Sequence, residues 1–193
     1  MNICIYGSAR DEIDEIYRKK GYELGEEIAK HNHSLVFGGG SEGMMGAVAR
    51  GVYDNNGEIH GIAPVWMKNF EGIFKECDRF IYTKSMDERK NLFLKESDAF
   101  IITPGGIGTL DEFFEIMTLK KLKQHNKPII IYNINHFFNE MITMINEMIN
   151  KQFLSKESLD LIQITDNIED MKIMTLKKLK QHNNWFIMLF ELF

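Results

Sequence analysis

The chain has 193 residues, of which 44% are hydrophobic and 26% are charged, and its formal net charge is -5 at pH 7. This length fits one globular domain with a sizeable core, and the composition argues against a disordered chain and against a membrane protein. The negative charge argues against nucleic acid as the main partner. Any phosphate site must therefore be built locally, from backbone amides and a few cations.

Short apolar runs recur along the chain, with a helix-length segment between most of them. This alternation is typical of a parallel sheet covered by helices on both faces. We therefore predict a single α/β domain with a Rossmann-like, doubly wound, mainly parallel sheet of about seven strands. The apolar runs cover residues 3–7, 34–39, 58–63, 79–83, 99–106, 128–133 and, more weakly, 161–165.

Two of the helices between these runs are well marked. Residues 11–32 start with acids and then carry apolar residues at mostly helical intervals, and residues 135–150 carry a single apolar stripe. The apolar positions are Ile13, Ile16, Tyr17, Leu24 and Ile28 in the first segment, and Phe138, Met141, Ile142 and Ile145 in the second.

The end of the chain repeats an earlier segment. The ten residues 117–126, MTLKKLKQHN, occur again at 174–183, and no other part of the chain recurs with them. We interpret residues 1–173 as the domain and 174–193 as an extension that arose by local duplication or as a sequence artefact. The final apolar residues are too few to span a bilayer, which takes about 20.

The two cysteines, Cys4 and Cys77, lack metal-ligand spacing, and we expect buried free thiols in a reducing compartment. The opening MNICIYGS shows neither a basic region nor a long apolar core of a secretory signal. We therefore expect a cytoplasmic protein.

Ligands of doubly wound sheets bind at the carboxyl ends of the strands, and four of the expected strands end in chemically rich loops. The loop FGGGSEGMMG contains a formal G-x-G-x-x-G at Gly38, Gly40 and Gly43. The next run ends in Ala63 and Pro64 without the acid that would bind a ribose, which disfavours a dinucleotide. A Walker sequence is also absent.

The loop PGGIGT is better suited to a single phosphate. Its glycines Gly105, Gly106 and Gly108 allow close approach of backbone N–H groups, and a helix expected to begin near Thr109 adds its positive end. The alternative is a tight turn without a ligand. Two glycine loops at strand ends favour phosphate binding.

Two helix starts match the capping-box pattern, Thr109 with Glu112 and Ser85 with Glu88. We interpret Glu88 as a capping residue. Glu112 differs because the glycine loop precedes it, so its carboxylate would lie beside a bound phosphate ester. Arg89 and Lys90 follow close behind Glu88, either as anion ligands or as cations neutralised on a solvated face.

The sequence offers few other candidates for catalytic groups. The histidines are scattered, so we expect no zinc site, and Ser8 lacks the setting of a hydrolase nucleophile. A carboxylate and an arginine can split a glycosidic bond without a metal, because the acid stabilises the cationic sugar or activates water while the arginine anchors the substrate.

The segments SMDERK, PGGIGTLDE, FGGGSEGMMGAVA and HNKPIIIYN, taken together, resemble the LOG (Lonely Guy) family from about residue 2 to residue 173. The resemblance implies a Rossmann-like homodimer that hydrolyses nucleoside 5'-monophosphates, typically cytokinin riboside monophosphates, to the free base and ribose 5-phosphate. It implies no cofactor, and we see no lysine context for pyridoxal phosphate.

The resemblance also implies roles for single residues. Arg89 and Glu112 match the catalytic arginine and glutamate. The residues expected to bind substrate are Gly7, Ser8, Gly39, Gly40, Gly43, Glu71, Lys90, Gly105, Gly106, Gly108, Thr109, Asp111 and Thr118. Ile107 replaces the family's usual tyrosine and Asp87 a common histidine, which leaves the preferred base open.

Two questions stay open at this point. A carrier or sensor of a phosphorylated nucleotide or a molybdenum-cofactor-like ligand is the alternative function, although retention of both Arg89 and Glu112 argues against it. The stripe of Phe113, Phe114 and Met117 could be a dimer surface or core.

Overall fold

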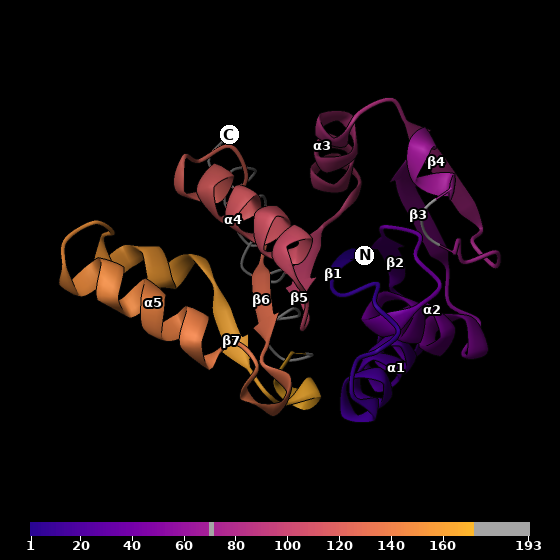
Figure 1. Ribbon diagram of the computed structural model, residues 1–193, viewed down its shortest axis with the longest axis horizontal. Coiled ribbons are helices and arrows are strands. Elements are labelled where there is room, and N and C mark those ends of the chain that lie inside the picture. The colour runs from indigo at the N-terminus through magenta and orange to yellow at the C-terminus, as the bar shows by residue number, and fades with distance from the viewer. Residues whose placement is uncertain (70–71, 172–193) are drawn as a thin grey trace, which may run out of the picture.

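The computed structural model describes residues 1–69 and 72–171. Within them, seven strands form one sheet in the order β4-β3-β2-β1-β5-β6-β7, and each strand runs parallel to its neighbours (Figure 1). The predicted doubly wound sheet of seven strands is confirmed. The strands are β1 (Asn2–Tyr6), β2 (Ser34–Phe37), β3 (Ile59–Pro64), β4 (Arg79–Thr83), β5 (Ala99–Ile102), β6 (Ile129–Tyr132) and β7 (Gln163–Thr165).

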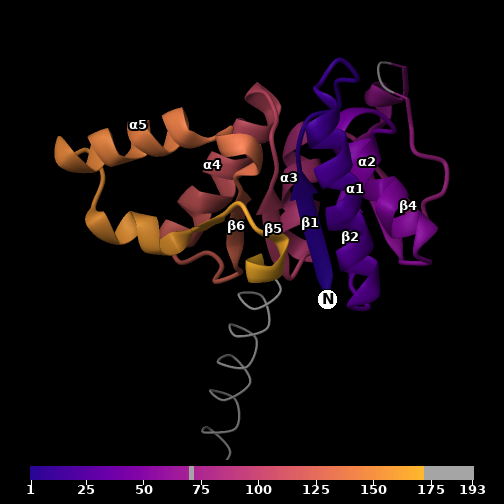
Figure 2. The ribbon, with the colours of Figure 1, turned by 90° about the horizontal axis from the view of Figure 1, so that it is seen from below.

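Helices cover both faces of the sheet, as expected for parallel strands joined by crossovers. On one face α1 (Glu15–Lys30) packs against α2 (Gly43–Asp54), and on the other lie α3 (Met86–Glu96) and α4 (Ile107–Lys121). A fifth helix, α5 (Asn139–Asn150), extends outward beyond α4 in both views of the ribbon (Figure 1, Figure 2).

The core consists of two layers, one on each side of the sheet, because side chains alternate along a strand. Ile3 and Ile5 of β1 face α1 and α2, while Cys4 and Tyr6 face α3 and α4. The thiols of Cys4 and Cys77 are both free, as predicted, and Cys4 is fully buried while Cys77 is half-buried.

Both predicted helices are shorter than the sequence pattern suggested. The first begins only after Asp14 and ends before Asn32, whose φ of 56° lies outside the right-handed helical region. The second begins at Asn139, because Asn135 and His136 also have positive φ. The predicted stripe of α5 is confirmed, with Phe138 and Ile145 buried and Met141 and Ile142 packed against the core.

The strand order reverses between β1 and β5, so the loops that follow these strands meet at the switch point where doubly wound sheets bind ligands. Within residues 1–69 and 72–171, no helix is long and apolar enough to cross a membrane. The predicted extension 174–193 lies outside the described residues.

Candidate active site

The loops after β1 and β5 are held against each other. The amide of Ser8 donates to the carbonyl of Pro104 at 3.1 Å, and the hydroxyl of Thr103 donates to the carbonyl of Tyr6 at 2.9 Å. A Cβ at Gly7 would lie 2.2 Å from Thr103 Oγ1. Gly7 is therefore required for this close approach, whether or not it also touches a ligand.

The glycine loop after β2 brings the start of α2 to the same edge. Gly43 has a φ of +61° and lies against the carbonyls of Ser8 and Arg10, and the amide of Met45 donates to the Ser8 carbonyl at 3.0 Å. Gly39, with a φ of +81°, packs on the ring of Phe80. Gly39 and Gly43 are therefore explained by their positive φ and by close packing, without a ligand.

The turn before α4 differs from the prediction. The helix begins at Ile107, two residues earlier than expected, with Gly106 as its N-cap and without a capping side chain. The predicted cap by Thr109 is therefore wrong, because the earlier start places Thr109 at the third helical position. Its side chain is buried instead, with its hydroxyl close to Gly105.

The same turn leaves room for an anion. The first N–H groups of a helix have no partner within it, and these groups surround Gly106 and Gly108. A Cβ at either glycine would meet nothing within 4 Å. Unlike Gly7 and Gly43, these two glycines are not explained by packing, which fits a backbone that a ligand approaches.

Arg89 and Glu112 meet beneath these loops. Arg89 Nη1 donates to Glu112 Oε1 at 2.8 Å, although the two residues come from different helices, α3 and α4. Both are buried, with exposed fractions of 7% and 8%. The two residues predicted to be catalytic are thus brought into direct contact, in a low-dielectric setting that strengthens their interaction.

Three further groups orient Arg89, and the sequence pattern did not identify them. Its Nε donates to the carbonyl of Ile62 at 3.3 Å, its guanidinium stacks 4.8 Å above the centre of the Phe93 ring, and a Cβ at Gly38 would lie 2.6 Å from Nη2. Phe93 is four residues after Arg89 on a helix, so this contact could have been found from spacing.

The carboxyl group of Glu112 titrates near neutrality. Burial raises its pKa to about 7, and the charge of Asp111 adds to the increase, while Arg89 and Lys90 oppose it. Among the described residues, no group donates to its second oxygen, Oε2. Glu112 is therefore held through one oxygen and offers the other to a substrate or to water.

The second capping-box pattern forms the expected local contact. The amide of Glu88 donates to Ser85 Oγ at 3.1 Å, and Glu88 Oε2 accepts from the amide of Lys84 at 2.7 Å. The interpretation of Glu88 as a capping residue is confirmed. Two glutamates in the same local pattern thus have different partners, and of the two only Glu112 contacts Arg89.

Lys90 lies between two acids of α4. Its ammonium group is 2.7 Å from Asp111 Oδ2 and 2.8 Å from Glu115 Oε2. Glu115 was not predicted, although it follows Asp111 by one helical turn and shares its face.

Some predicted site residues are not gathered here. Thr118 is exposed and lies six residues after Glu112, about 120° around the helix, so it points away from the pair. Ile107 is 88% exposed at the start of α4. Glu71 lies outside the described residues. Phe113 and Met117 are core, while Phe114 is half-buried against it.

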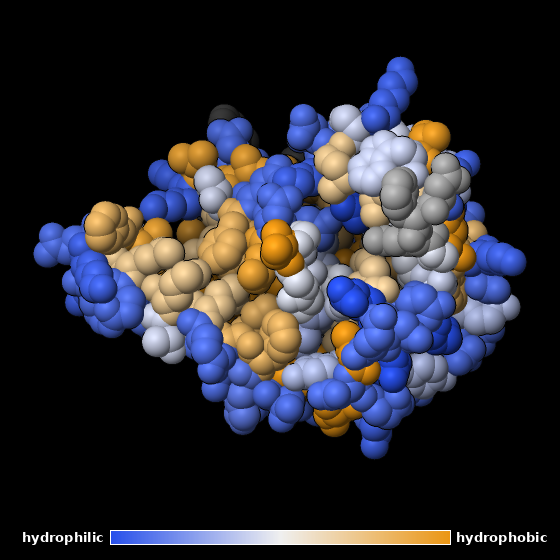
Figure 3. Space-filling view, in the orientation of Figure 1, coloured by the Kyte–Doolittle hydropathy of each residue, from blue (hydrophilic) through white to orange (hydrophobic). Residues whose placement is uncertain are grey.

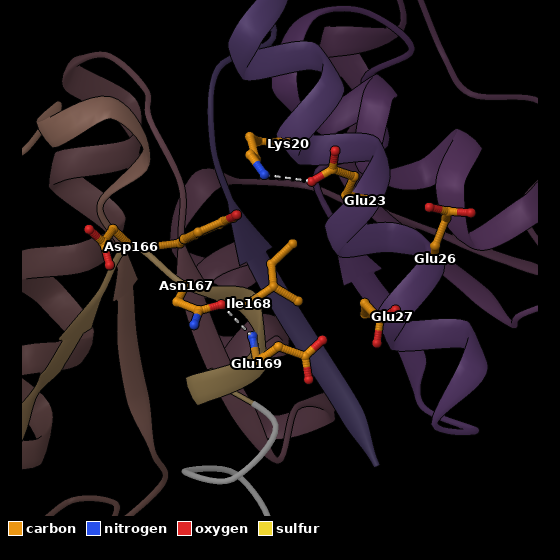
Figure 4. Close-up of a pocket in the computed structure, with 9 residues that line it drawn as sticks. Lys20, Glu23, Glu26, Glu27, Asp166, Asn167, Ile168 and Glu169 are labelled. Carbon is orange, nitrogen blue, oxygen red and sulfur yellow. Dashed lines mark hydrogen bonds and ion pairs between the residues drawn. The ribbon is translucent and has the colours of Figure 1, made fainter.

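Two of the hollows in the described residues bear on where a phosphate ester could bind. A small one lies next to Arg89 and is lined by Gly38, Gly39, Gly40, Ala63, Met67, Lys68, Gly72 and Ile73. A larger one, of about 480 Å³, lies between α1 and the segment after β7, and Figure 4 shows carboxylates from both sides around it. These carboxylates would repel a phosphate ester, which disfavours this hollow as a phosphate site. Within the part of the chain that the structure describes, no group of three or more His, Cys, Asp or Glu side chains could hold a metal.

Comparisons with known proteins identify the family of the chain. A family model described as "Possible lysine decarboxylase" matches residues 45–174. The cytokinin riboside 5'-monophosphate phosphoribohydrolase LOG3 of Arabidopsis thaliana is 30% identical over 180 residues, covering 93% of this chain and 82% of the relative. The probable phosphoribohydrolase LOGL3 of Oryza sativa subsp. japonica is 32% identical over 152 residues, covering 79% and 72%.

Solved structures share the fold. The molybdenum cofactor binding protein from Rippkaea orientalis superposes with a TM-score of 0.67 at 24% identity, covering 92% of this chain and 94% of that protein. At this identity the likeness extends to the arrangement of helices and strands alone.

Proposed function

Because the chain belongs to the LOG (Lonely Guy) family, we propose that it hydrolyses the N-glycosidic bond of a nucleoside 5'-monophosphate, releasing the free base and ribose 5-phosphate. The proposed substrate is AMP or an N6-substituted AMP of the cytokinin riboside monophosphate type. The observation that carries the proposal is the buried Arg89–Glu112 pair, 2.8 Å apart, beside an open glycine turn at the start of a helix.

In this proposal the turn at Gly105, Gly106 and Gly108 binds the 5'-phosphate. The free N–H groups at the start of α4 donate to the phosphate oxygens, and the positive end of the helix favours their charge. In the same proposal Ser8, whose amide donates to Pro104, and the glycine loop at Gly39, Gly40 and Gly43 also contact the substrate. Binding the phosphate fixes the distance of the sugar from the catalytic pair.

Glu112 then acts on the anomeric carbon. As the bond to the base breaks, positive charge develops on the ribose ring, and the carboxylate stabilises that charge or takes a proton from the attacking water. The water oxygen becomes bonded to the anomeric carbon, and the base leaves with the bonding electrons and gains a proton. Arg89 keeps Glu112 in place and leaves Nη2 available for a substrate oxygen.

We predict that kcat/KM rises with pH and levels off above about pH 7. The pKa of Glu112 is raised to about 7, so below that value the ionised fraction falls tenfold for each pH unit. A pH–rate profile of ribose 5-phosphate release measures this rise in kcat/KM. A flat profile between pH 5 and pH 8 would exclude an ionised Glu112 as the active form.

The proposal is tested with a substrate panel. AMP, N6-isopentenyl-AMP and the other nucleoside monophosphates are incubated with the protein, and ribose 5-phosphate and free base are quantified. Equal release of both products supports hydrolysis, and the ratios between substrates give the base preference that Ile107 leaves open. The absence of release above that of Glu112→Gln would reject the proposal.

The carrier alternative is separated by the same panel. A carrier would bind a phosphorylated ligand without turnover, and Glu112→Gln would not weaken that binding. A buried carboxylate beside a phosphate site does not favour binding an anion, which supports the enzyme over the carrier.

We also propose a homodimer that forms through the face bearing α4 and α5. Figure 3 shows apolar side chains gathered over this part of the molecule. A monomer seldom leaves such an area in water. The exposed apolar side chains on and around these helices include Leu122, Phe137, Met144, Met148 and Phe153.

The expected solution mass is therefore twice the 22.5 kDa of the chain, and the double variant Met144→Lys, Met148→Lys should halve it. Light scattering after size exclusion gives the mass. Ile16→Lys, an equally exposed apolar position on α1, is the control and should remain dimeric. If the double methionine variant remains a dimer, the interface lies elsewhere on the molecule.

A further inference from the structure

The hollow between α1 and the segment after β7 is lined by acids on both sides. Glu23, Glu26 and Glu27 come from α1, and Asp166 and Glu169 follow β7 (Figure 4). Its volume of about 480 Å³ lies within the range of pockets that hold small organic ligands. Among the described residues of its lining, none belongs to the nucleotide site proposed above.

Lysines of the chain neutralise these acids only in part. Lys20 Nζ lies 2.8 Å from Glu23 Oε2. Lys30 Nζ lies 3.7 Å from Glu26 Oε1 and 3.6 Å from Glu27 Oε1. Two lysines thus face five acids, and the described part of the hollow keeps a net negative charge, which attracts a cation.

The hydroxyl of Tyr132 opens onto the same hollow. Tyr132 is the last residue of β6, is only 1% exposed and lines the hollow together with Glu23 and Asp166. Burial, followed by the charges of these two acids, raises the pKa of Tyr132, so the hydroxyl keeps its proton at neutral pH. Within the part of the chain that the structure describes, no group hydrogen-bonds this hydroxyl, whereas a buried tyrosine hydroxyl usually has a partner. The hollow is therefore where a partner for this hydroxyl belongs.

The arrangement of these groups does not suit a metal ion. Anywhere in the described chain, no three His, Cys, Asp or Glu side chains gather closely enough to hold one. The acids are spread along the hollow instead. Glu23 and Glu27 are one helical turn apart, about 5–6 Å between Cβ atoms, and Ile168 lies between α1 and Asp166 (Figure 4). An extended cation, with ammonium groups joined by short methylene chains, matches both this spacing and the apolar surface.

We propose that this hollow binds a linear polyamine. One ammonium group donates to the Tyr132 hydroxyl oxygen and to the carboxylates of Glu23 and Asp166, and the next ammonium group lies against Glu27. The methylenes between them pack on Ile168. The bound polyamine links α1 to the segment after β7 and stabilises the folded protein by mass action. This site is additional to the proposed hydrolysis and does not rest on it.

The test is calorimetric titration of the full chain with spermidine, for which one saturable site is expected. Tyr132→Phe keeps the ring and removes only a hydroxyl that has no partner among the described residues. The variant should therefore fold and bind spermidine about three- to tenfold more weakly. The double variant Glu23→Gln, Asp166→Asn removes two charged acceptors of one ammonium group and should weaken binding by at least about tenfold.

The double variant Glu157→Gln, Asp160→Asn is the matched control. It removes the same charge from two exposed acids that do not line the hollow. The titrations are made in about 0.1 M NaCl, where exposed charges more than about 10 Å apart are largely screened. The control variant should therefore bind spermidine within about twofold of the natural chain.

A second measurement follows the midpoint of thermal unfolding. Spermidine should raise this midpoint in the natural chain and in the control variant, and should raise it less in Glu23→Gln, Asp166→Asn. MgCl₂ at the same ionic strength should not reproduce the increase. Neither measurement uses turnover, so the release of ribose 5-phosphate decides the proposed function alone.

Three results would overturn the proposal. They are the absence of saturable spermidine binding, an affinity that Tyr132→Phe leaves unchanged, and a control variant that loses as much affinity as Glu23→Gln, Asp166→Asn. The last result would mean that the net charge of the protein attracts the polyamine, and not the hollow.

Discussion

Glu112→Gln should lower kcat by about 10²- to 10⁴-fold, the range typical for loss of a catalytic proton acceptor or charge. Glutamine has the same size as glutamate and can still accept from Arg89 through one oxygen. It carries no negative charge, so it can neither stabilise the cationic ribose nor take a proton from water. Release of ribose 5-phosphate from AMP under saturating conditions measures the effect.

Glu88→Gln is the matched control. Glu88 occupies the equivalent position of the other T/S-x-x-E pattern and accepts only from the backbone of Lys84. Glutamine serves a capping box as well as glutamate does, so kcat should stay within about twofold. If both variants were equally active, Glu112 would be a structural residue and the proposed mechanism would fall.

Arg89→Met should destabilise the fold by about 3–5 kcal/mol at pH 8, the usual result of leaving a buried charge without its partner. The effect should depend on pH in a defined direction. The pKa of Glu112 is raised to about 7, so at pH 5 the folded protein holds this carboxyl in its neutral form. The cost of removing Arg89 is then smaller at pH 5 than at pH 8. Denaturant unfolding at the two pH values measures it.

Two further variants complete the test. Arg79→Met also removes an arginine from an ion pair, but that side chain is 53% exposed, and the expected cost is at most about 1 kcal/mol. The double variant Arg89→Met, Glu112→Gln removes both charges and should recover much of the stability at pH 8. Equal losses at pH 5 and pH 8 would mean that the ionisation of Glu112 does not change between these pH values.

The sequence was sufficient to predict the strand and helix order of the fold and the loops that surround the candidate site. Short apolar runs at helix-length spacing identify the strands, and a parallel sheet places the carboxyl ends of these strands at one edge. The glycines after β5 therefore had to lie near those after β1. Local chemistry also predicted the cap at Ser85, because all its partners lie within four residues.

Tertiary partners could not be predicted in this way. The patterns at Ser85 and Thr109 are equivalent in sequence, yet Glu112 turns to Arg89 because α3 lies beside α4 in space. Helix α4 starts two residues earlier than the sequence predicted, because Gly106 adopts the N-cap conformation without a capping side chain from Thr109. The two acids that hold Lys90 are visible as neighbours on one helix face, but the distance between the helices is needed to pair them with a cation.

The position of the site at the strand-order reversal has a consequence for how the protein folds. β1 pairs with β2 after about thirty residues of chain, as in any short crossover, but the contact between Tyr6 and Thr103 spans 97 residues. Contacts of such long sequence separation form late, because the loop entropy must be lost before the contact is made. The edge that carries the proposed phosphate site is therefore among the last parts of the sheet to assemble, and a nascent chain that ends before β5 lacks half of that site.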